Sequence, residues 1–444
     1  MTPRASGGRR TEDLVARDLA HLWHPFTQHS VWPDDDPLIV ERAEGMYLYD
    51  SEGRRYLDGV SSLWVTVHGH REPRIDHAIK KQMDRLAHTT FLGLTHEPGI
   101  VLAEKLLASA PSSLNRVFYA GDGASAVEAA IKMAYQAAAQ RGEFRPLYVH
   151  LAEGYHGDTL GAVSVGGIET FHATYRPILL ETRQVSSPGV LRPGQTRAER
   201  AHEVTQELRE VLDRDGDRVC AIIVEPLVQA AAGMLTHDGS FLRGARALAD
   251  EFGALMIADE VATGIGRTGR MWAVDGAAVR PDLLTCGKGL SGGYLPISAV
   301  LASEAVYEAF LGTPASGRTF FHGHTYTANP LACAAAVANL DLMAERGTVE
   351  HAAKVGERMG ELLTPLERHE GVVEIRRLGT MVGIEVRDVG ERTGFRVCQA
   401  ARRRGVWLRP LGDVVICMPP LAIEDEQVEE LCGAATEAID EVFQ

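Results

Sequence analysis

The chain has 444 residues and a formal net charge of −15 at pH 7, with 45% hydrophobic and 24% charged residues. The length allows two or three structural units around a large buried core. The acidic balance argues against nucleic acid or an anionic membrane as a partner, because both are bound through basic patches. No apolar run approaches the ~18 residues of a membrane span, and the first ten residues lack a signal-peptide core.

The six cysteines lie far apart in the sequence and form no Cys-x-x-Cys pair. This spacing gives no support to zinc or redox motifs. Most of the cysteines lie in apolar surroundings, which predicts buried free thiols in a reducing compartment. A cytoplasmic protein is therefore the expectation.

The first 72 residues are predicted to form an N-terminal arm and part of a smaller domain. Residues 1–19 are polar and are expected to be loose. Phe26 follows in an otherwise polar stretch, where an aromatic side chain could be core or could line a pocket. Short strands are predicted over residues 38–60, with a hairpin turn at Glu52-Gly53.

A strand predicted at 116–120 leads through a Gly-rich turn, Gly121-Asp122-Gly123, into a helix predicted over 125–141. The free amides and the positive dipole end of such a helix suit a phosphate. The turn lacks the Gly-Lys-Ser/Thr of a P-loop and the third glycine of a dinucleotide fingerprint. A plain strand, turn and helix is the alternative interpretation.

The loop Gly154-Tyr155-His156-Gly157 follows the next strand, predicted at 147–151. A tyrosine in a tight glycine-flanked loop can stack on a planar ring. A tyrosine that only makes a structural hydrogen bond is the commoner case, so both interpretations stay open at this point.

Helices and strands then alternate, which predicts a parallel or mostly parallel sheet with right-handed crossovers. The last strand of the series, at 254–259, delivers Asp259-Glu260 at its C-terminal end, where open α/β sheets bind ligands. The pair could instead cap a helix or bind a metal, but no His or Cys cluster with ligand spacing lies nearby. The other elements of the series are predicted at 201–214, 219–225 and 241–252.

A short apolar strand over 281–286 ends at Gly287-Lys288-Gly289. Burial disfavours the charged form of a lysine, and a lysine with a lowered pKa is a nucleophile towards carbonyl groups. The flanking glycines allow a flat ligand to approach the backbone closely. A solvated lysine in a surface turn is the alternative interpretation.

After about residue 345 the pattern changes to that of a smaller α+β domain. A large α/β domain is therefore predicted over 73–340 and a C-terminal domain over 341–444. Its helices are predicted at 350–367, 394–404 and 424–443, and its strands at 372–376, 381–386 and around 411–413.

Four motifs, in this order, resemble the class III (fold type I) aminotransferases that depend on pyridoxal 5′-phosphate (PLP): Gly121–Glu128, Gly154–Thr159, Ile257–Gly269 and Cys286–Gly293. The resemblance covers roughly residues 20–440. It implies an α/β fold with a mostly parallel seven-stranded sheet, and a homodimer with shared active sites. It also implies that Lys288 binds PLP and moves the substrate proton, that Asp259 keeps the ring nitrogen protonated, and that Glu225 supports Asp259.

Further site residues follow from the same resemblance. The amides of Gly123 and Ala124 would hold the PLP phosphate, together with Thr325 of the partner subunit. His324 could contact that phosphate or could simply fit the turn. Arg409 would bind the acceptor's carboxylate, with a surface salt bridge as the alternative. The substrate-binding set is Phe26, Leu63, Trp64, Tyr155, Gly323 and Arg409.

A second set of motifs narrows the resemblance to members that aminate 8-amino-7-oxononanoate in biotin synthesis: Leu22–Thr27, Asp58–Trp64, His68–His70, Thr95–Pro98 and Trp407–Gly412. The usual donor there is S-adenosylmethionine. Phe26, Leu63 and His324 differ from the residues common at these positions, which makes lysine an alternative donor. A buried leucine at position 63 would still suit an apolar acceptor.

Two other functions remain open. The chain could be another class III ω-aminotransferase, acting on a diamine or an ω-amino acid with pyruvate or 2-oxoglutarate. It could also be a PLP-binding regulator without activity, although no DNA-binding motif or basic extension supports this.

Overall fold

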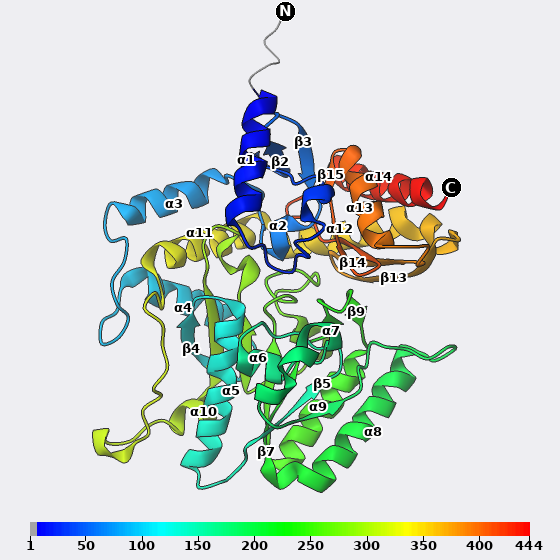
Figure 1. Ribbon diagram of the computed structural model, residues 1–444. Helices are drawn as coiled ribbons and strands as arrows, with labels where there is room; N and C mark the ends of the chain where they lie inside the picture. Colours follow the sequence, from blue (N-terminus) through cyan, green and yellow to red (C-terminus); the bar gives the residue numbers. More distant parts are fainter. Residues whose placement is uncertain (1–6) are drawn as a thin grey trace, which may run out of the picture.

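The computed structural model describes residues 7–444 (Figure 1). Its largest sheet has seven strands in the order β4-β12-β11-β10-β7-β5-β6. The strands from β6 to β11 run parallel, and β12 is antiparallel to both of its neighbours, so the predicted mostly parallel sheet is confirmed. The bounds are β4 (Leu114–Ala120), β5 (Leu147–Leu151), β6 (Thr182–Val185), β7 (Val219–Val224), β10 (Leu255–Asp259), β11 (Leu283–Cys286) and β12 (Ser298–Ser303).

Helices cover both faces of this sheet. Successive side chains of a strand point to opposite faces. Ile223 of β7 accordingly packs against α5 (Gly123–Gln140), while its neighbour Ile222 packs against α8 (Arg197–Asp215) and α9 (Gly239–Phe252). Burial on both faces explains why these strands read as nearly continuous apolar runs. The face covered by α8 and α9 also carries α4 (Glu97–Ser109) and α11 (Pro330–Arg346). Helix α3 (Pro73–Met83) packs on the outside of α11.

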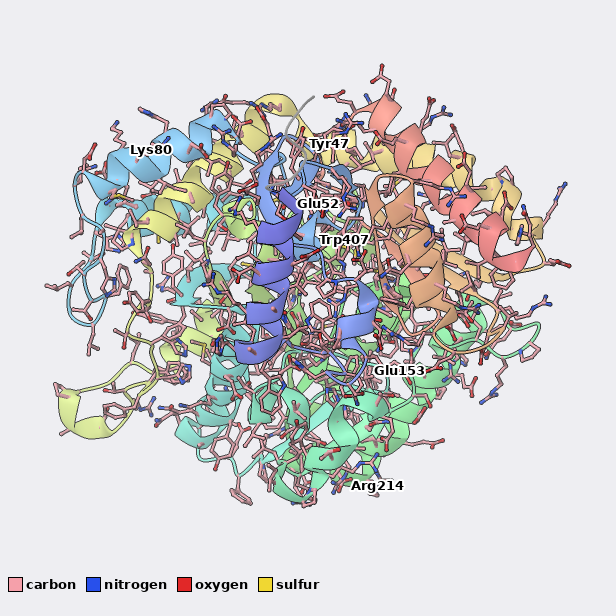
Figure 2. All side chains as sticks on the ribbon, turned by 45° about the horizontal axis from the view of Figure 1, so that its top comes forward. Tyr47, Glu52, Lys80, Glu153, Arg214 and Trp407 are labelled. Carbon is pink, nitrogen blue, oxygen red and sulfur yellow. The ribbon has the colours of Figure 1, made fainter. Side chains whose placement is uncertain are left out.

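Two four-stranded sheets form the other end of the molecule. One sheet joins strands from both ends of the chain, since β15 pairs with β3. Tyr47 of β2 and Trp407 of β15 are labelled in Figure 2. Its strands are β1 (Val40–Glu44), β2 (Tyr47–Asp50), β3 (Arg55–Asp58) and β15 (Val406–Trp407). The other sheet contains β13 (Val372–Leu378), β14 (Met381–Val386), β17 (Val414–Cys417) and β16 (Arg409–Leu411).

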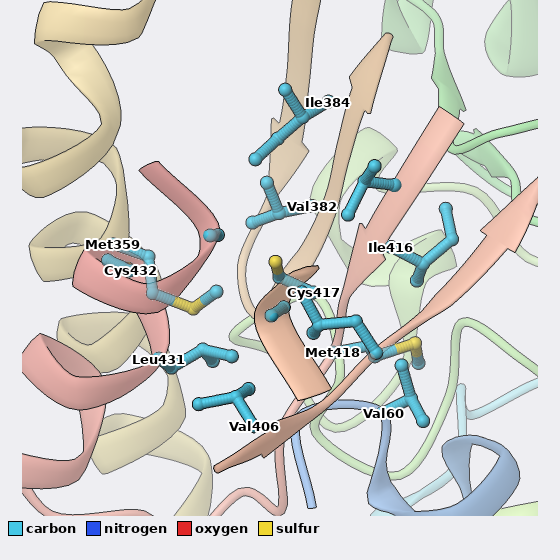
Figure 3. Packing of buried hydrophobic residues seen from close by; sticks show 14 of the residues in the cluster. Val60, Met359, Val382, Ile384, Val406, Ile416, Cys417, Met418, Leu431 and Cys432 are labelled. Carbon is cyan, nitrogen blue, oxygen red and sulfur yellow. The ribbon is translucent and has the colours of Figure 1, made fainter. Parts of the chain in front are cut away.

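A separate apolar core holds this end together (Figure 3). Met359 and Leu431 come from helices, and they belong to the same buried cluster as Val382 and Ile416 from the sheet. The covering helices are α12 (Thr348–Leu363), α13 (Thr393–Arg403) and α14 (Asp425–Phe443). The shorter elements include α2 (Ser61–Trp64), α6 (Leu160–Ser164), α7 (Glu169–His172), α10 (Glu304–Glu308), β8 (Val228–Gln229) and β9 (Leu235–Thr236).

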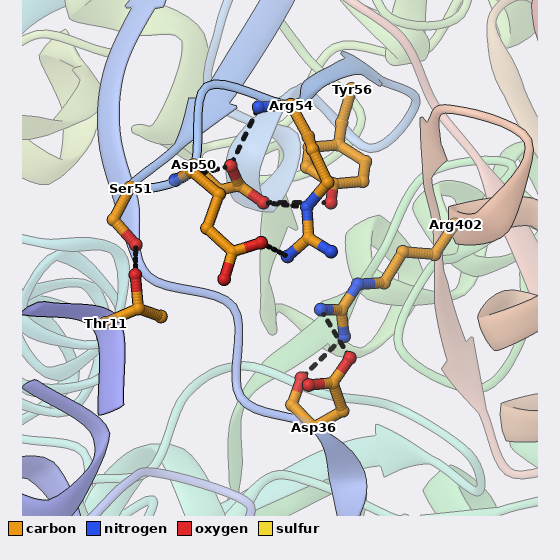
Figure 4. A network of polar contacts seen from close by, with 8 residues as sticks. Thr11, Asp36, Asp50, Ser51, Arg54, Tyr56 and Arg402 are labelled. Atoms are coloured by element: carbon orange, nitrogen blue, oxygen red, sulfur yellow. Dashed lines mark hydrogen bonds and ion pairs between the residues drawn. The ribbon is translucent and has the colours of Figure 1, made fainter. Parts of the chain in front are cut away.

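The start of the chain differs from its prediction. Of residues 1–19, which the sequence predicts to be loose, residues 7–19 belong to helix α1 (Gly7–His21), and residues 1–6 lie outside the described residues. The helix is tied to the following hairpin, because the hydroxyls of Thr11 and Ser51 are 2.7 Å apart (Figure 4). Beside them, Asp50 accepts hydrogen bonds from Arg54 and Tyr56.

Element bounds agree closely with the sequence patterns elsewhere, and the strands expected at 147–151 and 381–386 match to the residue. The helix expected to reach residue 367 ends at Leu363 and continues as a 3₁₀ turn, since Pro365 has no amide hydrogen to donate. The boundary proposed at 340/341 falls inside α11, and the division into 1–72, 73–340 and 341–444 stays a prediction. In residues 7–444 no helix has the length and apolar character needed to cross a membrane.

Candidate active site

A pocket of about 410 Å³ opens where β5, β7, β10 and β11 end. Such an edge is where open α/β sheets bind ligands. The pocket brings together seven residues predicted for the site: Trp64, Gly123, Ala124, Tyr155, Glu225, Asp259 and Lys288. A larger groove of about 750 Å³, between α8 and α12, contains none of the predicted site residues.

Lys288 follows β11 and begins a 3₁₀ turn over Lys288–Ser291. Its φ of 43° lies in the left-handed region, a strained conformation for a residue with a side chain. Its Nζ lies 5.5 Å from the centre of the Trp64 ring. Burial lowers the pKa of Lys288, although the carboxylates of Asp259 and Glu225 act in the opposite direction. The site thus contains a lysine amine disposed to react as a nucleophile.

Asp259 ends β10 and is held by three hydrogen bonds. One carboxylate oxygen accepts from the Thr285 hydroxyl and from the Val261 amide, at 2.9 and 3.0 Å. The other oxygen lies 2.6 Å from Nδ1 of His156. Burial opposes a charge on His156, but the hydrogen bond to Asp259 and the nearby Glu225 outweigh it and raise the pKa of His156. These contacts fix the position of the Asp259 carboxylate at the pocket wall.

His156 is a site residue that sequence reasoning missed. Its loop was selected for Tyr155 alone, and nothing in the sequence pairs a loop histidine with a carboxylate 103 positions away. The only available signal was the position of His156 between a candidate ring-stacking residue and a glycine.

Glu225 fixes the loop that contains Tyr155. Its two carboxyl oxygens accept hydrogen bonds from the backbone amides of Tyr155 and Ala230, both at 3.0 Å. Burial raises the pKa of Glu225 to about 7, with a smaller contribution from Asp259 that also raises it. Glu225 thereby connects the end of β7 to the loop after β5.

The start of α5 has the geometry of an anion site. Asp122 caps the helix by accepting a hydrogen bond from the Ser125 amide at 2.9 Å, and the helix begins with Gly123 and Ala124 at the pocket wall. Amides in the first turn have no acceptor within the helix. A Cβ at Gly123 would lie 2.6 Å from Cγ1 of Val261, so a side chain does not fit here.

The pocket residues fit PLP. The volume suits a small cofactor, and a lysine amine, the Asp259 carboxylate and helix-terminal amides all face one space. These are the groups needed for the aldehyde, the ring nitrogen and the phosphate of PLP.

Other predicted site residues lie outside this pocket in a single chain. Gly323, His324 and Thr325 are exposed in the segment between α10 and α11. Leu63 is 46% exposed, which corrects the expectation of a buried leucine, because the adjoining Ser62 and Trp64 have left-handed backbones that turn Leu63 outward and Trp64 inward.

The two remaining residues lie beside the pocket. The ring of Phe26 packs edge-on against Phe171 with centroids 5.3 Å apart. Arg409 on β16 is half-buried and close enough to Tyr155 for their charges to interact. Burial lowers the pKa of Arg409, and Tyr155 opposes this shift.

Glu260, next to Asp259, points away from the pocket. Its carboxyl group accepts hydrogen bonds from the amides of Ala273 and Val274, both at 2.8 Å, and from the Thr263 hydroxyl. Burial raises the pKa of Glu260 to about 7 from an ordinary value of 4.5. Glu260 is therefore a structural residue beside a catalytic candidate.

The Glu260 carboxyl group should make stability depend on pH. The folded protein binds more protons than the unfolded chain between pH 4.5 and about 7, so this group's stabilisation falls by about 3 kcal/mol as pH rises through that range. Glutamine does not titrate. The free energy of unfolding of E260Q, relative to wild type, should therefore rise by about 3 kcal/mol over the range, measured from urea unfolding curves. A difference that stays constant with pH would contradict the raised pKa.

The fold and the pocket together define an α/β protein with a buried lysine at the ligand-binding edge of its sheet. The family model for class-III aminotransferases matches residues 30–439, and the chain belongs to this family. The predicted family and fold are thus confirmed.

Three relatives show what the chain is similar to. It is 48% identical to the adenosylmethionine-8-amino-7-oxononanoate aminotransferase of Nitratidesulfovibrio vulgaris, over 97% of this chain and 82% of the relative. A solved structure of the enzyme with that name from Methanocaldococcus jannaschii has a TM-score of 0.91 and 38% identity, covering 97% and 99% of the two chains. A PLP-bound amine transaminase from an uncultivated Pseudomonas species has a TM-score of 0.89 and 33% identity, covering 95% and 98%.

Proposed function

We propose that this chain is a PLP-dependent aminotransferase that converts 8-amino-7-oxononanoate to 7,8-diaminononanoate in biotin synthesis. The observation that carries the proposal is a pocket joining Lys288 to Asp259, in a chain 48% identical over nearly its whole length to an enzyme named for this acceptor. The six cysteines are all free and buried, which supports a reducing compartment and hence the cytoplasm.

The pocket residues divide the work between them. When bound, PLP supplies a protonated ring that accepts electrons from the substrate carbon that loses its proton. Lys288 would hold the cofactor through its amine and, once free, would remove and return that proton. Asp259, held in place by His156 and Thr285, would keep the ring nitrogen protonated. The amides of Gly123 and Ala124 would bind the phosphate.

Residues from both ends of the molecule would bind the substrate. Arg409 is half-buried beside Tyr155, where a guanidinium can hold a carboxylate in a bidentate pair. Trp64 and Tyr155 offer apolar ring surface along the pocket. Phe26 and Leu63, both partly exposed, would close the mouth around the carbon chain.

The proposed enzyme is a homodimer with shared sites. Thr325 of the partner subunit would complete the phosphate site, with Gly323 and His324 of the partner subunit beside it. Gly323, His324 and Thr325 are exposed in a single chain, together with large apolar side chains such as Leu92 (88% exposed) and Phe321 (83%). Such exposure supports a surface that is covered by another subunit.

Half-reactions would test the function. Protein loaded with PLP is mixed separately with S-adenosylmethionine, lysine and 7,8-diaminononanoate, while the visible absorbance of the bound cofactor is followed. Diaminononanoate should convert the cofactor to its aminated form, and so should the natural donor.

The same preparation should sediment at twice the chain mass of 48.2 kDa, and a monomer would contradict the shared sites.

The second candidate is another class III ω-aminotransferase, acting on a diamine or an ω-amino acid with pyruvate or 2-oxoglutarate; a solved structure named an amine transaminase, with a TM-score of 0.89, supports it. If diaminononanoate leaves the absorbance unchanged while another amine converts it, the biotin-pathway proposal is wrong and this second candidate replaces it.

A further inference from the structure

A small polar cavity lies beside the active site and shares no lining residue with it. It measures about 170 Å³ and lies between β5, β6 and the segment that contains α6 and α7. Polar side chains form much of its wall: His150, Ser164, Glu169, His172, Arg176, Thr182 and Gln184.

Two buried histidines in this wall have ring nitrogens without a well-formed hydrogen bond to protein. His172 is 6% exposed, and neither of its ring nitrogens makes a hydrogen bond of good geometry within residues 7–444, although the backbone of Gly166 lies near the ring. His150 is 4% exposed; its Nε2 lies 3.2 Å from the Thr182 hydroxyl, and its Nδ1 makes no hydrogen bond of good geometry. Burial lowers the pKa of both histidines, that of His150 to about 4. Each is therefore a neutral imidazole with one donor and one acceptor nitrogen.

Water is the ligand that fits these groups. A neutral imidazole needs a partner that can both accept and donate, and a small polar cavity usually supplies ordered water to buried groups of this kind. A metal is a poor fit, since the described residues contain no cluster of three or more His, Cys, Asp or Glu side chains able to hold one.

His172 also packs against the active-site loop. Its ring lies nearly parallel to that of Tyr155, with centroids 6.5 Å apart and planes at 11°. Phe171 contacts Tyr155 edge-on at 6.2 Å, and the Tyr155 hydroxyl donates to Asp158 at 2.8 Å. A Cβ at Gly166 would lie 2.3 Å from His172, so this glycine leaves the space that His172 occupies.

We propose that His172 is a positioning residue for Tyr155, held in its orientation by ordered water in the cavity that it shares with His150. Tyr155 lines the active-site pocket on one side of this contact and His172 lines the water cavity on the other. Water bonded to the His172 ring fixes the plane of that ring, and the parallel contact fixes the tilt of Tyr155. The inference rests on the proposed function only in that Tyr155 is taken to lie against cofactor or substrate.

Three variants test the role of His172. H172A removes the ring and should raise KM for the reacting amine about ten-fold, with kcat changed less than about three-fold. H172F keeps a ring but cannot bind water, so its KM should rise about three-fold. T170A, at an exposed position of α7, should leave both constants unchanged.

The outcomes are separable. Circular dichroism shows whether H172A is folded. A folded H172A with the KM and the cofactor absorbance of wild type would overturn the positioning role. If H172A fails to fold, H172F decides the question, and a wild-type KM in H172F would refute the part played by water.

A crystal structure of the wild-type holoenzyme supplies a readout that needs no turnover. Water should lie within about 3 Å of the unpaired nitrogens of His172 and His150, and a dry cavity would refute the proposal. The positions of the waters and the cofactor absorbance can both be measured without the acceptor substrate. A wild-type enzyme that fails to aminate 8-amino-7-oxononanoate would therefore overturn the proposed function and leave the role of His172 standing.

Discussion

Replacing Lys288 with alanine should lower transamination at least about 1000-fold, because the variant would lose both the amine proposed to hold the cofactor and the base proposed to move the proton. Lys288 is the lysine at the pocket wall, next to Asp259 and under the ring of Trp64. The measurement is turnover of the wild-type substrates, with bound PLP quantified separately.

The fold of K288A should not weaken. A buried amine whose pKa is lowered by burial carries a desolvation cost, and alanine removes that cost. The thermal midpoint of the apo-protein should therefore equal or exceed that of wild type. K354A, at an exposed position of α12, is the matched control and should keep full activity. K288A turnover within ten-fold of wild type would show that another group performs the chemistry.

The positions of Lys288 and Asp259 could be predicted because the sheet is mostly parallel. The carboxyl ends of parallel strands meet at one edge, so residues that end β10 and β11 must lie close together whatever their separation in the chain. The helix start at Gly123 was predictable for the same reason, because α5 follows a strand that ends at this edge.

Contacts between distant loops could not be predicted in this way. His156 pairs with Asp259 because two loops meet in the folded chain, and no periodicity reports such a meeting. Helix α1 is similar, since Asp18 accepts a hydrogen bond from Trp32 and Arg10 pairs with Glu41. A polar composition suggested a loose segment because these partners cannot be identified from local sequence.

The side-chain directions around Trp64 depend on backbone detail. Alternation along a short segment predicts which face a residue takes only if the backbone is regular. Here Ser61, Ser62 and Trp64 all have φ between 51° and 65°, so neighbouring side chains do not follow a strand or helix period. Trp64 therefore reaches the pocket while Leu63 faces outward, a result that required the structure.

Asp259 and Glu260 are neighbours in the chain, but only Asp259 lines the pocket. D259N should lower kcat by about 100- to 1000-fold, the range seen when one electrostatic stabiliser of a transition state is removed. The amide can still accept from Thr285 and Val261 and can donate to a neutral His156, so the fold should survive. What is lost is the negative charge that the ring nitrogen of PLP requires.

E260Q is the matched control, because Glu260 follows Asp259 directly and its side chain points away from the pocket. Its amide nitrogen would face a backbone amide of Ala273 or Val274, which at pH 4.5 should lower the free energy of unfolding by about 1–3 kcal/mol, a deficit that shrinks as pH rises toward 7. Its kcat, measured where the variant is fully folded, should stay within about three-fold of wild type, because Glu260 does not line the pocket. Equal losses of kcat in D259N and E260Q would mean that either substitution simply disturbs the structure at the end of β10. Asp259 would then lose its assignment as the partner of the ring nitrogen.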